Sequence, residues 1–220
     1  MRGVGEISVP VVPGGLVADV TVPYAARGVV LFAHGSGSSR HSPRNVAVGR
    51  ALHARGLGTV LVDLLTIDEE ARDEVTAALR FDIGMLADRL AGIVDWMATE
   101  PELGRLPTGI FGASTGAAAA LVAAAARPDR VGAVVSRGGR PDLAGRALSG
   151  VRAPTLLLVG GLDEQVIALN EQARGVLGEV AELRVVPGAG HLFAEPGTLE
   201  EVAEQAGTWF RTHLRQPHPV

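Results

Sequence analysis

Three residues of this chain have the side chains needed for nucleophilic chemistry, and each follows an apolar run. Ser114 stands in the turn Gly-Ala-Ser-Thr-Gly, Asp163 follows the run LLLVGGL, and His191 lies in a glycine-rich loop. A serine hydroxyl is a weak nucleophile until a base takes its proton, and the pKa of histidine suits that task near neutral pH. A carboxylate can orient the imidazole and stabilise its cation. These residue types predict a Ser-His-Asp triad.

The turn around Ser114 has the composition of a nucleophile elbow, in which a serine is presented between a strand and a helix. Gly112 and Gly116 flank it, and the alanine-rich run 117–126 follows. Glycines suit a sharp turn because bulky neighbours would block it. A helix behind the serine would aim its N-terminal amides at the nucleophile. The alternative is a plain turn, since Gly, Ala and Ser are abundant in this sequence.

Asp163 and His191 each have a simpler structural interpretation. Aspartate is a common N-cap, and Asp163 directly precedes an expected helix. A loop histidine is commonly just hydrogen-bonded in place. The order Ser114, Asp163, His191, with each residue directly after an expected strand, is nevertheless the order of the α/β-hydrolase triad. We therefore predict Ser114 as nucleophile, His191 as base and Asp163 as the orienting acid.

An oxyanion hole has candidates in two loops. The backbone amide of Thr115, directly after the nucleophile, is the expected first donor. The second should come from the loop that begins His34-Gly35 after the run 29–33, where Ser36 is our choice and Gly37 the next. The alternative is a glycine-rich turn. We assign His34 a supporting role in that loop.

Apolar runs alternate with helix-period segments along most of the chain, which predicts a parallel sheet covered on both faces. The exception is a leading β-hairpin over 6–12 and 16–22, around Pro-Gly-Gly. The expected strands are 29–33, 58–64, 108–113, 131–136, 153–159 and 182–186, and the expected helices 46–55, 82–97, 115–126, 141–148, 164–177 and 199–213. The fold class is α/β, a doubly wound, mostly parallel sheet with an antiparallel N-terminal hairpin. Chemistry in such sheets lies at the carboxyl ends of the strands.

Composition narrows the class of protein. Residues 1–220 read as one domain, with 47% hydrophobic and 20% charged residues. The net charge of −4 gives no basic footprint for nucleic acid. No apolar stretch approaches the roughly 20 residues that a membrane span needs, and residues 1–10 lack the apolar core of a secretion signal. We expect a cytoplasmic protein without a membrane or nucleic-acid partner; its oligomeric state is left open.

Two residue types are missing from the sequence. It has no cysteine, and all 20 basic residues are arginine, so it has no lysine either. A thiolate nucleophile, a cysteine metal site, a Schiff base and a P-loop lysine are thereby excluded. Any catalysis depends on serine, histidine and carboxylates, and we expect neither a metal nor an organic cofactor.

With these motifs the chain resembles the α/β-hydrolase superfamily over nearly its whole length. The short length, the leading hairpin and the absence of a cap insertion are similar to the dienelactone hydrolase family. Three segments resemble a bacterial subgroup that is sometimes fused to a phosphoribosyltransferase domain: 34–45 (HGSGSSRHSPRN), 79–83 (LRFDI) and 136–141 (SRGGRP). The resemblance implies ester chemistry. Dienelactone hydrolase itself has cysteine at the position of Ser114, so a dienelactone substrate does not follow.

Charged residues in the expected loops bear on the substrate. Arg40, Arg137 and Arg140, with Arg44 nearby, lie on the expected catalytic side, where guanidinium groups suit carboxylate or phosphate. The alternative is that they are solvated or paired with surface acids. We interpret the acidic stretch within 68–74 as a solvated helix face, or part of a loop bordering the site.

The sequence leads to a serine hydrolase that cleaves a small ester, lactone or thioester through an acyl-enzyme on Ser114. Two alternatives stay open. An acyltransferase would use the same residues, with an alcohol or thiol in place of water. A ligand-binding protein could retain the fold without catalysis.

Overall fold

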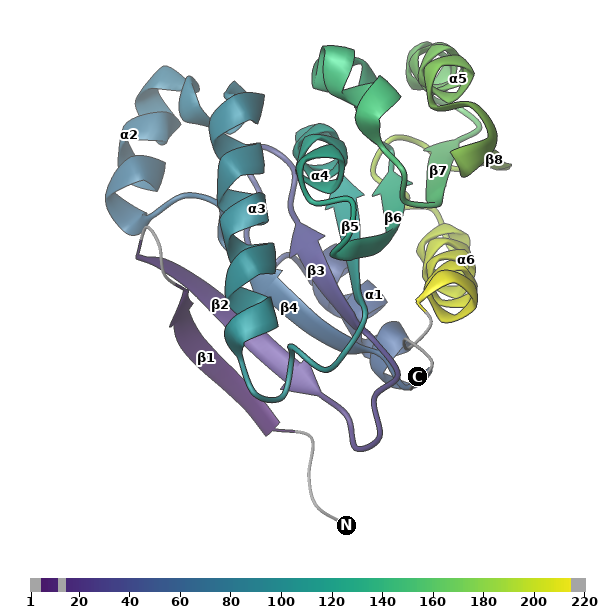
Figure 1. The fold of residues 1–220 in the computed structure, drawn as a ribbon. Coiled ribbons are helices and arrows are strands. Elements are labelled where there is room, and N and C mark those ends of the chain that lie inside the picture. Colours follow the sequence, from purple (N-terminus) through teal and green to yellow (C-terminus); the bar gives the residue numbers. More distant parts are fainter. Residues whose placement is uncertain (1–4, 12–14, 215–220) are drawn as a thin grey trace.

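The computed structural model describes residues 5–11 and 15–214 and contains one eight-stranded sheet in the order β1-β2-β4-β3-β5-β6-β7-β8 (Figure 1). The strands are β1 (Gly5–Val11), β2 (Leu16–Val22), β3 (Val29–Ala33), β4 (Gly58–Val62), β5 (Thr108–Ala113), β6 (Val131–Arg137), β7 (Thr155–Gly160) and β8 (Ala181–Val186). β1 and β2 are antiparallel to each other, β2 is antiparallel to β4, and all other neighbours are parallel. The predicted hairpin and parallel sheet are confirmed; the turn over 12–14 lies outside the described residues.

Helices cover both faces of the sheet (Figure 1). They are α1 (Pro43–His53), α2 (Ile67–Thr76), α3 (Ile83–Thr99), α4 (Thr115–Ala126), α5 (Glu164–Leu177) and α6 (Thr198–His213). One core cluster joins the sheet to α3, α4 and α5, and a second joins it to α1 and α6. Because β3, β4, β5 and β7 are buried along their whole length, their sequences are apolar without polar alternation.

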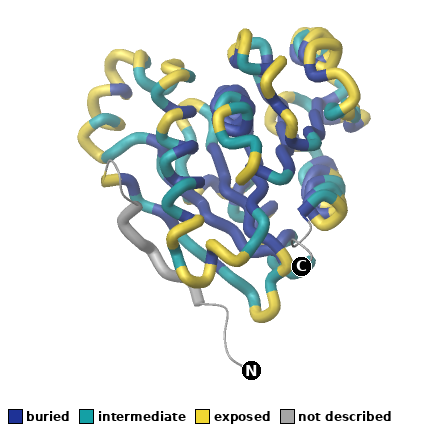
Figure 2. The backbone as a smooth tube through the Cα atoms, viewed as in Figure 1, coloured by how far each residue is buried: buried dark blue, intermediate teal, exposed yellow. Residues whose placement is uncertain are grey.

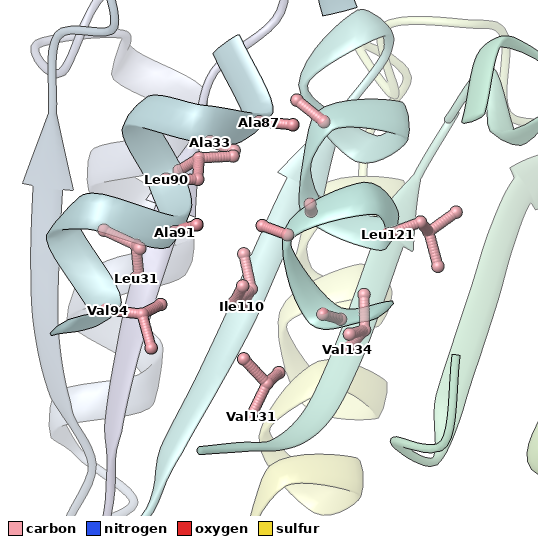
Figure 3. Close-up of a cluster of buried hydrophobic side chains, with 14 of the residues drawn as sticks. Leu31, Ala33, Ala87, Leu90, Ala91, Val94, Ile110, Leu121, Val131 and Val134 are labelled. Carbon is pink, nitrogen blue, oxygen red and sulfur yellow. The ribbon is translucent and has the colours of Figure 1, made fainter. Parts of the chain in front are cut away.

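The central helix α4 is packed closely on the sheet. Leu31 and Ile110 of the strands, Leu90 and Val94 of α3 and Leu121 of α4 form one cluster (Figure 3). Most of α4 is buried, as its blue colour in Figure 2 shows. Alanine side chains let this helix approach its neighbours closely, and the start of α4 thereby holds the turn at Ser114 against the sheet.

The largest differences from the sequence prediction lie in three regions of the chain. α1 begins at Pro43 rather than at 46, because proline suits the first turn of a helix. The segment 141–148 forms 3-10 turns over Pro141–Gly150, interrupted at Gly145, where φ is 52°. α2 and the 3-10 turn Leu79–Phe81 occupy the segment between β4 and α3 that was expected to be mainly a loop.

Candidate active site

The turn at Ser114 has the geometry of a nucleophile elbow. Ser114 has φ 50° and ψ −121°, a conformation that residues with a side chain seldom adopt. A Cβ at Gly112 would lie 2.5 Å from the Cα of Ala117, and one at Gly116 would lie 2.3 Å from the carbonyl oxygen of Ala33. No side chain fits at either position without moving the backbone. Both flanking glycines are therefore required by contacts with β3 and α4.

Backbone hydrogen bonds tie Ser114 to the end of β6. The Ser114 amide donates to the carbonyl of Arg137 over 3.2 Å, and the Arg140 amide donates to the carbonyl of Ser114 over 3.1 Å. A Cβ at Gly35 would lie 3.1 Å from the Cβ of Ser114, so the loop after β3 passes directly beside the serine. Ser114 is thus placed between the ends of β3, β5 and β6.

The structure brings Asp163 and His191 together. Asp163 Oδ2 and His191 Nδ1 are 2.6 Å apart. Asp163 stands at the N-cap position of α5, but its side chain makes no capping hydrogen bond. The simpler interpretation of this residue as a helix cap is therefore wrong, and its carboxylate is directed to the imidazole.

His191 lies beside Gly138, the residue that directly follows β6. A Cβ at Gly138 would lie 3.7 Å from His191 Cε1 and 3.0 Å from the His191 carbonyl oxygen. Gly138 directly follows Arg137, whose carbonyl holds the amide of Ser114. Within the described chain the Ser114 hydroxyl has no hydrogen bond to His191. Such contacts are often loose until a substrate binds.

His34 supports the loop after β3, as expected from its place there. Its Nε2 accepts from the amide of Leu64 over 3.1 Å, and its Nδ1 lies 3.0 Å from the carbonyl oxygen of Gly35. Burial lowers the pKa of His34, which favours the neutral ring. A neutral ring that accepts at Nε2 carries its proton on Nδ1 and donates to Gly35. The imidazole therefore joins this loop to the end of β4.

The two predicted oxyanion donors lie next to each other. The Ser36 amide donates to Thr115 Oγ1 over 3.0 Å. The Thr115 amide is in the first position of α4, where no intrahelical acceptor is available. The Ser36 amide is thus already engaged, and an oxyanion would have to share it with the threonine hydroxyl or displace that hydroxyl.

A cavity of about 180 Å³ lies beside Thr115. Its walls come from the loop after β3, the end of β4, α2 and the start of α3. Acidic side chains in these walls are Asp63, Glu70, Asp73 and Glu74. Asp63 pairs with Arg40, and Asp73 pairs with Arg80. This cavity offers room for one part of a small substrate, on the α2 side of the serine.

The predicted substrate-binding arginines divide into two groups. Arg40 contacts Asp63 and lies 3.2 Å from Asp19, and Arg140 makes two hydrogen bonds to Asp142, of 2.8 and 2.7 Å. Both guanidinium groups are thereby engaged by acids. Arg137 is different, because it is only 7% exposed and no acid in the described residues pairs with it.

Sequence reasoning missed the structural role of the segment between β4 and α3. Asp73 was expected on a solvated face, but it is 2% exposed and 2.5 Å from Arg80 Nε. Glu69 makes two hydrogen bonds to Arg89, of 2.6 and 2.8 Å. The solvated interpretation is therefore wrong for these two carboxylates. The capping box of Thr66 and Glu69, readable as Thr-x-x-Glu, was the signal that could have found α2.

The part of the chain that the structure describes has neither a membrane-spanning helix nor a cluster of metal ligands. No helix there is long and apolar enough to cross a membrane. No group of three or more His, Asp or Glu side chains in the same residues is arranged to hold a metal ion.

The sheet order, the elbow and the missing cap define an α/β-hydrolase fold. Solved structures share it. Est1E from Butyrivibrio proteoclasticus superposes with a TM-score of 0.75 at 16% identity, covering 94% of this chain and 98% of its own. XC6422 from Xanthomonas campestris, described as an a/b serine hydrolase without lid, gives 0.73 at 22%, covering 100% and 98%.

The chain belongs to the dienelactone hydrolase family, whose sequence profile matches residues 15–214. A crystal structure of dienelactone hydrolase from Anabaena variabilis is 54% identical, with a TM-score of 0.93 over 97% of this chain and 99% of that one. A Mycobacterium tuberculosis protein named putative phosphoribosyl transferase is also 54% identical, over 97% of this chain. The alignment covers 47% of that protein, so this chain spans about half the length of the curated relatives it matches.

Proposed function

We propose that this member of a hydrolase family is a serine hydrolase that cleaves a small carboxylic ester, lactone or thioester. The observation that carries the proposal is the 2.6 Å bond between Asp163 and His191, placed beside a serine in an elbow conformation. When His191 Nδ1–H donates to the Asp163 carboxylate, Nε2 is left as the base that can accept a proton from a hydroxyl.

The reaction would proceed in two steps. The Ser114 oxygen attacks the substrate carbonyl while His191 Nε2 takes its proton, and the negative oxygen is held by the Thr115 amide, with Ser36 as second donor. His191 then protonates the leaving alcohol or thiol, leaving an acyl group on Ser114. Water attacks this ester with His191 again as base, which releases the acid and restores the serine. Asp163 stays charged throughout and stabilises the imidazolium.

The surroundings of the elbow favour a small substrate. The cavity beside Thr115 has a volume of about 180 Å³, too small for a long acyl chain. Between β6 and β7, where a cap could be inserted, the chain has only the 3-10 turns of Pro141–Gly150. Short acyl groups are therefore expected to be cleaved best.

The transferase name of the Mycobacterium relative does not change this proposal. We infer that the name refers to the half of that protein outside the alignment, because this chain matches only the other half and has the elbow, Asp163 and His191 of a hydrolase. An acyltransferase on the same residues differs only in the acceptor of the second step. Product analysis with methanol or a thiol as competing acceptor distinguishes the two, and transfer products in excess of the free acid would favour the transferase.

Covalent labelling with a fluorophosphonate tests the nucleophile directly. The probe reacts with an activated serine, so the wild-type protein should be labelled, and Ser114→Ala should not. Ser149→Ala is a matched control, since Ser149 is exposed and its hydroxyl bonds only to the carbonyl of Arg146. Wild-type protein that is folded and unlabelled would contradict the proposal, and so would labelling that persists in Ser114→Ala.

Substrate preference can be measured with 4-nitrophenyl esters of increasing chain length, run beside lactones and thioesters. Acetate and butyrate should give the highest kcat/KM, and Ser114→Ala should lower it at least about 10⁴-fold. A preference for esters of twelve carbons or more would contradict the expected small acyl site.

A further inference from the structure

Arg137 and Arg44 form a basic pair that has no acidic partner among the residues described by the structure. Arg137 ends β6 and is 7% exposed, and its buried Nη1 has no hydrogen-bond partner in the described residues. Arg44 lies in the first turn of α1, and its buried Nε also has no partner there. The charge of Arg44 is felt at Arg137, because burial first and Arg44 second lower the pKa of Arg137 to about 10. Two like charges are therefore held near each other.

The pair lies on the α1 side of the sheet. Side chains alternate along a strand, so Arg137 points to the same face as Val135, which belongs to the core cluster with α1 and α6. The N-terminus of α1 is on this face, and its first turn contains no acidic residue. A helix N-terminus carries positive partial charge, which adds to that of the two arginines. This region is positive from three sources.

The lack of pairing is specific to these two side chains among the arginines near the elbow. Arg40, Arg80 and Arg140 each contact a carboxylate, and so does Arg89. A buried charge without a partner is unfavourable, and proteins normally pair it or leave it in water. An anion from outside the chain would satisfy both guanidinium groups, which bind carboxylate and phosphate with paired hydrogen bonds.

The backbone of Arg137 also adjoins the proposed nucleophile. The carbonyl of Arg137 accepts the hydrogen bond from the Ser114 amide, and the next residue, Gly138, borders the ring of His191. We propose that Arg44 and Arg137 bind a carboxylate or phosphate group of the substrate whose ester bond Ser114 cleaves. The proposal rests on the proposed function for the identity of the bond, and adds the charge of the molecule that carries it.

Matched esters test the charge preference. On the acyl side the pair is mono-4-nitrophenyl glutarate and 4-nitrophenyl pentanoate, and on the alcohol side 4-acetoxybenzoate and phenyl acetate. The wild-type enzyme should prefer the anionic member in at least one pair. Arg137→Met should lower the ratio of kcat/KM, anionic over neutral, about 10- to 100-fold, as expected for a charge-assisted hydrogen bond. Arg50→Met, an exposed arginine on the same helix, should leave that ratio within twofold.

Binding without turnover separates this inference from the proposed function. In the Ser114→Ala protein, millimolar glutarate or inorganic phosphate should raise Tm, and adding Arg137→Met or Arg44→Met should remove that increase. A response to glutarate alone identifies a carboxylate, and a response to phosphate alone a phosphate ester. Arg137→Met without ligand should also raise Tm, because it removes a buried charge that has no partner.

Two results would overturn the anion site. One is a wild-type enzyme that prefers the neutral ester in both pairs. The other is an increase in Tm with glutarate or phosphate that survives in both arginine variants. The proposed function would still stand in either case if Ser114→Ala abolished turnover of the neutral esters. If Ser114→Ala kept full activity but lost the Tm increase with Arg137→Met, the anion site would stand without the serine mechanism.

Discussion

Among the described residues, charged side chains are paired on one side of Ser114 and unpaired on the other. On the α2 side, the buried or half-buried acids are matched by arginines, Asp73 by Arg80 and Glu69 by Arg89. On the α1 side, Arg137 and Arg44 have no acid in the described residues. On the α2 side, these pairs within the chain satisfy the charges and stabilise the fold. The α1 side is where we propose that an anionic group of the substrate binds.

This difference distinguishes arginines that look equivalent in the sequence. Arg40, Arg137 and Arg140 all lie at or after strand ends, but within the described residues only Arg137 of these three lacks a carboxylate partner. An arginine is thus a better candidate for ligand binding when it is buried and unpaired than when it merely lies near the site. Variants that remove a paired or an unpaired charged residue test this distinction.

The largest effect should come from the elbow that both sides share. Gly116→Ala would place a Cβ 2.3 Å from the carbonyl oxygen of Ala33 and 2.4 Å from that of His34, so the turn must move and Ser114 with it. We expect kcat to fall at least about 100-fold, since a shift of about 1 Å has that effect on catalysis, together with a clear loss of Tm. Gly175→Ala is the control: Gly175 lies within α5 with open space around it, and alanine there should raise stability by up to about 1 kcal/mol. Full activity in Gly116→Ala would show that the turn tolerates movement.

The second-largest effect is expected when Asp73 on the α2 side loses its arginine partner. Arg80→Met would leave the buried carboxylate of Asp73 with backbone donors alone, so Tm should fall by several degrees, whereas Arg137→Met should raise it. Adding Asp73→Asn to Arg80→Met should recover part of the loss. Thermal unfolding of the four proteins provides the measurement, and equal changes for both arginines would remove the distinction between the two sides.

Acid should weaken the α2 side in a defined range. Hydrogen bonds from Arg89 are the main reason that the pKa of Glu69 falls from its ordinary value of 4.5 to about 2. A carboxyl whose pKa is lower in the folded state contributes stability above pH 4.5, and that contribution is lost as the pH falls from 4.5 towards 2. Glu69→Gln should flatten the dependence of unfolding free energy on pH in this range, and Arg89→Gln should do the same. An unchanged slope in both variants would show that the pair does not couple to folding.

The smallest effect is expected for Arg140. Its pair with Asp142 is partly exposed, with side chains 38% and 25% accessible, so Arg140→Met should change stability by no more than about 1 kcal/mol. The preference between anionic and neutral esters should stay within twofold of wild type. A tenfold loss of that preference would place Arg140 with Arg137 and undo the division of the arginines.

The strand and helix around Ser114 were predicted to the residue, because local sequence decides them. β5 is a continuous buried apolar run. The alanine-rich segment after the turn has the composition of a buried helix. The bounds of α2 were not predicted, because its only large apolar residues, Ile67 and Val75, give no helical stripe. Its helical state depends on the capping box at Thr66 and on tertiary contacts.

Order along the chain was enough to select the triad candidates, since each follows a parallel strand and such strand ends meet at one edge. The partners of the charged side chains could not be predicted in that way. Asp73 and Arg80 are only seven residues apart, but Arg40 and Asp63 are joined across the sheet edge, and Arg137 is distinguished by the absence of a partner. Those relations depend on where loops from different strands are placed.

The backbone of Ser114 also bears on how this protein can change over generations. With φ at 50° and ψ at −121°, serine occupies a conformation that glycine tolerates far better, at a difference of about 1 to 3 kcal/mol. Ser114→Gly would therefore produce a more stable protein without a nucleophile. Keeping a serine here therefore costs the fold stability, and the proposed reaction is what would repay that cost.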